Sequence, residues 1–147
     1  MNELKMLSPK QVPFVSLHDC KITKISLNKK SVELIFDGYD VIENGNVTHI
    51  KNGKVVFLNC DEDDFFCYLL KWEPTEAGAE FYGLPISLSD LEKQIENGER
   101  IEIFVSAFEY NFIHLRGAVC KNKGNGRAPL IIIETHELFP VSYCWEE

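Results

Sequence analysis

Three adjacent residues, His18, Asp19 and Cys20, form the tightest group of chemically active side chains in the sequence. An imidazole, a carboxylate and a thiol can each bind a metal ion, and a metal-dependent hydrolase uses such groups. Neighbouring residues of a strand point to opposite faces, however, so this trio cannot surround one ion by itself. Any further ligands would have to come from the other histidines, which are His49, His114 and His136. Because their spacing matches no established site, we predict no metal and no cofactor, and we interpret Asp19 as a residue that binds backbone N–H groups.

His114 and Arg116 are a second candidate pair, because they alternate along a run that is typical of a strand. Both then lie on one face of the predicted sheet with Phe112, and Glu102 of the preceding strand could be their neighbour. The planar guanidinium of arginine binds carboxylates well, although a solvated sheet face is the plainer interpretation. The candidate binding residues are therefore His18, Asp19, His114 and Arg116; we predict no catalytic residue.

The elements that must position these residues begin with three turn dipeptides, Asp37-Gly38, Asn44-Gly45 and Asn52-Gly53. Such dipeptides favour two-residue hairpin turns, so the sequence predicts a β-meander. The expected opposite pairs are Phe36 with Tyr39, Ile42 with Val47, and Ile50 with Val55. One face of the meander then collects almost only apolar residues, which are Val32, Leu34, Phe36, Tyr39, Val41, Thr48, Ile50, Val55 and Phe57. A turn at 28–30 would add Ile25 and Leu27 to this face, and the opposite parity of Cys20 and Ile22 predicts a bulge near Thr23.

The same register places Asp40 opposite His49. A carboxylate that holds an imidazole is half of a catalytic triad, and the triad would need a nucleophile nearby. No G-x-S-x-G sequence is present. We therefore interpret the two residues as a cross-strand pair that stabilises the sheet.

The rest of the chain indicates more strands and one helix. The helix is expected at about 88–97, with Ser89 as its N-cap, Glu92 completing a capping box and Gly98 ending it. We expect strands at 65–72, 101–108, 112–120, 130–134 and 141–145, the fourth central and the last at an edge. In the second of these, Ile101, Ile103, Val105 and Ala107 should share a face. The segment 74–85 is expected to be a loop with extended pieces. The prediction is a single α+β domain over 1–147, in which a twisted, mainly antiparallel sheet of about eight strands, curled into a partial barrel, carries one helix.

Composition narrows the classes of partner. Hydrophobic residues make up 45% of the 147 residues and charged residues 26%, as in an ordinary globular protein. The net charge of −8 disfavours binding to nucleic acid, because the phosphate backbone is also negative. No apolar run is long enough for a membrane span or a signal peptide. The five cysteines form no C-x-x-C pair, which is typical of reduced thiols in the cytoplasm.

One segment, LHDCKITKISLNKKSVELIFDGY from Leu17 to Tyr39, resembles the opening of a loose group of uncharacterised bacterial proteins. These proteins begin with a hydrophobic residue, His-Asp and a small residue, followed by hydrophobic strands, and some are predicted immunity proteins of polymorphic toxin systems. The resemblance implies a β-rich protein that binds and neutralises a toxin, with His18 and Asp19 as signature positions.

We therefore expect a non-enzymatic protein-binding domain whose acidic surface meets a basic protein partner. A small hydrolase or metal-dependent enzyme using His18 and Asp19 is the first alternative, so enzymatic activity stays open. A structural or assembly subunit is the second, and the oligomeric state is not predicted.

Overall fold

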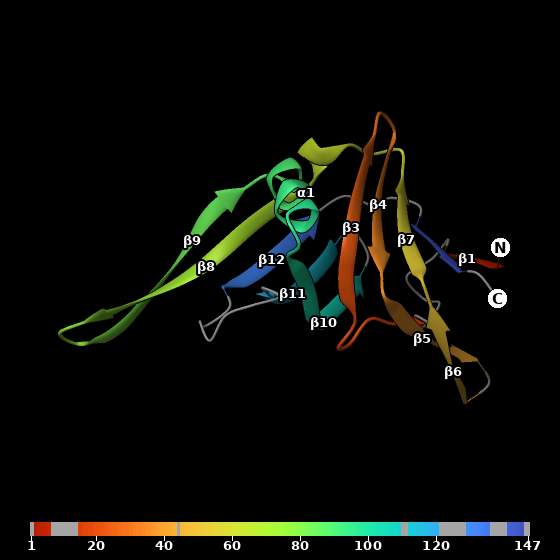
Figure 1. Cartoon of the computed structure of the whole chain (residues 1–147), viewed down its shortest axis with the longest axis horizontal. Coiled ribbons are helices and arrows are strands. Elements are labelled where there is room, and N and C mark those ends of the chain that lie inside the picture. Colours follow the sequence, from red (N-terminus) through yellow and green to blue (C-terminus); the bar gives the residue numbers. More distant parts are fainter. Residues whose placement is uncertain are drawn as a thin grey trace.

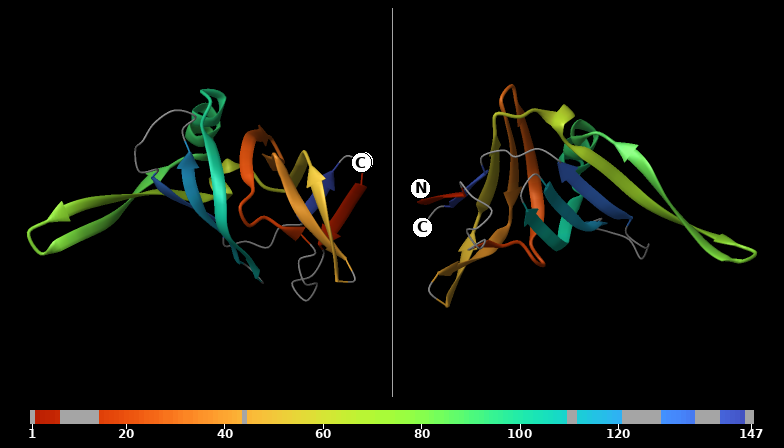
Figure 2. Two further views of the ribbon diagram at one scale, coloured as in Figure 1. Left: turned by 60° about the horizontal axis from the view of Figure 1, so that its bottom comes forward. Right: turned by 180° about the vertical axis from the view of Figure 1, so that it is seen from behind.

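The computed structural model describes residues 2–6, 15–43, 45–109, 112–120, 129–135 and 141–145. It confirms an α+β fold dominated by antiparallel strands (Figures 1 and 2). The described strands are β1 (Asn2–Met6), β2 (Val15–Ser16), β3 (Lys21–Asn28), β4 (Ser31–Phe36), β5 (Gly38–Glu43), β6 (Asn46–Lys51), β7 (Gly53–Leu58), β8 (Phe66–Thr75), β9 (Gly78–Ile86), β10 (Arg100–Glu109), β11 (Phe112–Cys120), β12 (Leu130–Thr135) and β13 (Val141–Trp145). The helices are a short 3₁₀ turn, η1 (Glu62–Asp64), and α1 (Leu88–Glu96).

Ten strands form one sheet in the order β1-β13-β7-β4-β3-β10-β11-β12-β8-β9. The described strands do not close into a barrel, since β1 and β9 remain as edges. Strands β3 and β10 share only two register pairs, Ile101 with Ile22 and Glu102 with Lys21. The sheet changes direction at this seam, and α1 lies over it, in contact with both strands (Figure 1).

The meander prediction is wrong in its pairing. Strand β4 pairs with β3 and β7, whereas β5 pairs with β6 and β2 in a separate three-stranded sheet. The pair Ile42–Val47 is confirmed, but Phe36–Tyr39 and Ile50–Val55 are not pairs. The dipeptides Asp37-Gly38 and Asn52-Gly53 lie opposite each other, and Asn52 N–H donates to the Asp37 carbonyl at 3.2 Å. They are therefore bends in two long strands and not hairpin turns. At the third expected turn, Asn44 lies outside the described residues, and the flanking residues Glu43 and Asn46 are paired.

The assignment of side chains to faces is nevertheless largely confirmed. Every residue expected on the apolar face is buried except Thr48, which is exposed, and Leu27, which is only partly buried against the core. Within this core, the Tyr39 hydroxyl donates to the Cys144 carbonyl at 2.7 Å and so ties β5 to β13. The predicted bulge is present as a register shift between Ile22 and Lys24. A two-residue turn at 29–30 follows from the pairing of Asn28 with Ser31.

The helix is where it was expected, but its N-cap is Ser87 and not Ser89. The Ser87 hydroxyl accepts a hydrogen bond from Asp90 N–H at 3.1 Å, and the Asp90 carboxylate accepts one from Ser87 N–H at 3.4 Å. Two overlapping serine-acid patterns occur here, and the observed one starts two residues earlier. Ser89 instead donates to the Glu62 carboxylate from both its N–H and its hydroxyl, which joins η1 to α1. Gly98 has φ +98°, as a helix stop requires.

Two further expectations are corrected. The segment 74–85 is not a loop, because β8 continues to Thr75 and β9 begins at Gly78. Strand β13 is not an edge, because β1 pairs along all of it. Strand β12 pairs with β8 only from Phe66 to Leu70, so the rest of the β8–β9 hairpin extends away from the sheet (Figure 1, green). We call residues 71–82 the arm.

Candidate functional site

His18 and Asp19 lie in the turn between β2 and β3. Asp19 has φ +62°, and its backbone N–H donates to the Ile103 carbonyl at 2.8 Å, across the seam between β3 and β10. Its carboxylate lies 3.0 Å from His18 Nδ1, and both side chains are about two-thirds exposed, at 65% and 69%. The pair is therefore a surface contact on a turn whose backbone is fixed by the sheet.

Each histidine of the described chain has its own carboxylate, and the three pairs lie on different elements. His49 Nδ1 lies 2.8 Å from Asp40 on the β5–β6 hairpin, which confirms the predicted cross-strand pair. His136 lies outside the described residues. No three His, Cys, Asp or Glu side chains in the described ranges are grouped so that they could hold a metal ion.

His114 and Arg116 lie on the side of β11 opposite to the buried residues Ile113 and Leu115. His114 Nδ1 is 2.6 Å from Glu134 on β12, so its acidic neighbour is Glu134 and not Glu102.

Arg116 is exposed and sits in a cross-strand row with Ile132 of β12 and Val105 of β10. We call this side of β10, β11 and β12 the outer face. Val105 was expected on the same face as Ile101 and Ile103, which are buried. A bulge at Phe104 reverses the alternation, and Val105 is 48% exposed.

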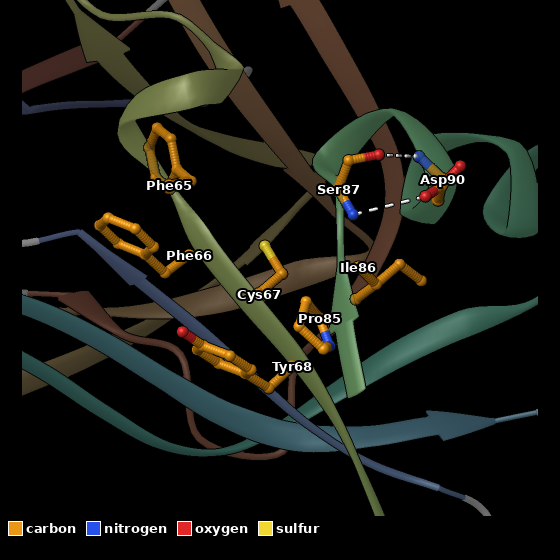
Figure 3. Close-up of a pocket in the computed structure, with 8 residues that line it drawn as sticks. All are labelled: Phe65, Phe66, Cys67, Tyr68, Pro85, Ile86, Ser87 and Asp90. Atoms are coloured by element: carbon orange, nitrogen blue, oxygen red, sulfur yellow. Dashed lines mark hydrogen bonds between the residues drawn. The ribbon is translucent and has the colours of Figure 1, made fainter. Parts of the chain in front are cut away.

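A cleft of about 300 Å³ opens at the base of the β8–β9 hairpin (Figure 3). It is lined by the first residues of β8, the end of β9 and the first turn of α1, namely Phe65, Phe66, Cys67, Tyr68, Pro85, Ile86, Ser87 and Asp90. The rings of Phe66, Tyr68 and Pro85 lie on one side of it, and the hydrogen-bonded pair Ser87–Asp90 lies on another. Phe66 is 49% exposed. No pattern in the sequence indicated this cleft, because it depends on β9 pairing with β8 where a loop was expected.

The ionisable groups of the cleft are few. Asp90 is exposed at its mouth, and Glu62 is bonded to the neighbouring Ser89. Burial raises the pKa of the Cys67 thiol to about 12, so the thiol stays protonated at neutral pH and is a poor nucleophile and metal ligand. An aromatic wall beside a carboxylate favours a cationic or apolar group.

A second hollow of about 300 Å³ lies nearby, lined by Lys29, Lys30, Asn59, Cys60, Asp61 and Asp64. Its two lysines offset two acids of the run 61–64. At the cleft itself, the carboxylates are Asp90, which lines it, and Glu62, which is bonded to Ser89 beside it.

No family model, curated protein or solved structure matches the chain. Within the described ranges, no helix is both long and apolar enough to cross a bilayer.

Proposed function

We propose that this chain is a non-enzymatic protein-binding domain of the immunity-protein kind, which binds a basic protein partner at the cleft. The observation that carries the proposal is the juxtaposition of exposed Phe66 and half-buried Tyr68 with the Asp90 carboxylate. A lysine or arginine entering the cleft would meet aromatic faces and an acid at once.

The net charge of the whole chain also favours a basic protein partner. A net charge of −8 attracts a basic protein over a distance and speeds its association. The resemblance of Leu17–Tyr39 to the opening of predicted immunity proteins adds a class of partner, a toxin that acts inside the cell. We place the complex in the cytoplasm, since none of the five cysteines, all of them described, is in a disulfide.

The experiment tests the product of the reading frame adjacent to the coding sequence, where an immunity protein's toxin is expected. The two proteins are co-expressed, co-purified and titrated by calorimetry at low and high salt. We expect a complex whose affinity falls with salt, and a more than roughly tenfold weaker complex for Phe66→Ser.

Val47→Ser is the matched control, because Val47 is 63% exposed on β6 and lies outside the cleft. It should bind like the wild type. The proposal would be refuted if Phe66→Ser and Val47→Ser weakened the complex equally. It would also be refuted if the chain formed no complex with a basic protein encoded by the adjacent reading frame.

The arm favours the second candidate function, that of an assembly subunit. Its two strands leave the sheet and carry no covering layer among the described residues.

A further inference from the structure

The arm is a two-stranded ribbon that no other described strand flanks or covers. Beyond Leu70, five register pairs join β8 to β9 and no other described strand pairs with either of them. The described side chains of this segment are exposed. An isolated two-stranded hairpin is only marginally stable in water, and three or more strands or a packed face are needed for independent stability.

The arm also carries an unfavourable charge arrangement. Glu73 and Glu80 are opposite each other in the ladder, and like charges directly opposite destabilise a strand pair. Tyr82 is 37% exposed on the same face, and its hydroxyl donates to Glu73 at 2.8 Å. Lys71, opposite Tyr82, is the only cation in the sequence of the arm. This face therefore offers an acidic pair beside an aromatic ring.

The outer face offers the complement. Arg116 is exposed between Ile132 and the 48% exposed Val105. None of the ion pairs found between described residues includes Arg116. Its cross-strand neighbours are apolar, and the His114–Glu134 pair lies in the next row of the same face. A guanidinium in this setting is suited to a partner that brings both carboxylates and apolar area.

We propose that two copies of this chain form a dimer in which the arm of each copy lies across the outer face of the other, with Glu73 and Glu80 against Arg116. The arm is long enough, because five residues of strand extend about 16 Å. Three strands about 4.8 Å apart span roughly 10–14 Å. The contact is made twice about a two-fold axis, so the assembly closes.

The contact is made by faces and not by strand addition. Pro74 and Pro85 each remove an N–H from the strands of this hairpin, and Lys71 and Glu80 place charges on them, as edge strands that avoid pairing do. Two copies of net charge −8 repel each other, mainly through charges that lie outside the proposed contact. Salt at physiological strength largely screens charges that are more than about 8 Å apart. This inference goes beyond the proposed function and can fail without it.

The test is sedimentation equilibrium of the purified chain at micromolar concentration. We expect twice the chain mass of 16.9 kDa. Arg116→Glu should weaken the dimer more than about tenfold, because it places like charges together, and so should the double variant Glu73→Arg/Glu80→Arg. Lys24→Glu is the matched control, since Lys24 is exposed on β3 and the substitution changes the charge equally. It should stay dimeric.

Mixing the two disrupted variants provides the decisive measurement. In the mixed pair, a wild-type arm meets Arg116 and the arginine-bearing arm meets the introduced glutamate, so the dimer should return. Circular dichroism and thermal melting establish that each variant is folded. A monomeric wild type, a dimer that tolerates Arg116→Glu, or a mixture that stays monomeric would each overturn the proposal. A wild type that is monomeric alone and assembles only with a basic partner would assign the arm to that partner.

Discussion

Gly53→Ala is the substitution whose consequence the structure defines most closely. Gly53 lies at the bend between β6 and β7, and a Cβ atom there would lie 2.1 Å from Cε1 and 2.3 Å from Cζ of Tyr39. The ring cannot easily move away, because Tyr39 is fully buried and makes edge-on contacts with Phe36 and Tyr143, at centroid distances of 6.3 and 6.4 Å. The hydroxyl is also fixed by its bond to the Cys144 carbonyl.

The cost can be assembled from three terms. Overpacking a core by one methyl group costs about 1–3 kcal/mol. If the ring shifts, the hydroxyl loses a hydrogen bond of about 1 kcal/mol. Replacing glycine by alanine restricts the unfolded chain and returns about 0.4–1 kcal/mol. We therefore expect a loss of about 2 kcal/mol in the free energy of unfolding, or about 6 °C in Tm for a chain of this length.

The assay is urea denaturation with a double-mutant cycle. Tyr39→Leu removes the two closest of the three ring atoms that collide with the new methyl group, so Gly53→Ala should cost at least about 1 kcal/mol less in that background. Gly83→Ala is the control, because its Cβ would meet Tyr68 only at an ordinary 3.6 Å. A cost below about 0.5 kcal/mol for Gly53→Ala, or strictly additive substitutions, would refute the reasoning.

Three further outcomes are expected. In the native protein, Cys67 should resist a thiol reagent at neutral pH, because burial raises its pKa to about 12. Half-buried Cys120 should react first. Equal reaction rates of the two cysteines would contradict this expectation. Lys54→Met should lower stability by less than about 1 kcal/mol, because Lys54 and Glu33 are partly solvated. The hydrogen bond to Glu33 raises the pKa of Lys54, so this contribution is present below the ordinary lysine pKa and is lost as pH rises through the raised value. If the difference in the free energy of unfolding between wild type and Lys54→Met grew as the pH rose, the result would contradict this reasoning. Ser87→Ala should cost about 1 kcal/mol in thermal melts, and an unchanged Tm would place the helix cap elsewhere.

Side-chain alternation predicted the core better than it predicted strand pairing. A two-residue turn and a two-residue bend both preserve the parity of a strand, so Phe36, Tyr39, Ile50 and Val55 fall on the buried face under either topology. Which strand pairs with which depends on contacts distant in sequence, such as that of Tyr39 with Cys144, 105 residues apart. The dipeptide signal carries no information about them. For the same reason β13 was placed at an edge.

The candidate sites divide along the same line. His114 and Arg116 were placed on one face correctly, because that placement needs only alternation along β11. The acid beside His114 was misassigned, because Glu134 reaches it from β12, 20 residues away. Val105 was placed on the face of Ile101 and Ile103 because a bulge at Phe104 leaves no clear mark on an apolar strand.

The cleft shows why the chemistry of adjacent residues was a poor guide to the most suitable binding site. His18 and Asp19 attract attention because they are neighbours in sequence, and in the structure they remain an exposed pair on a turn. Phe66 and Asp90 are 24 positions apart by number and come together only because β9 returns along β8 and leads directly into the Ser87 cap. That return also produces the arm. Both proposed contact surfaces thus depend on one hairpin, so replacing 71–82 by a tight turn should abolish the dimer while the cleft, whose walls lie outside that range, keeps its partner.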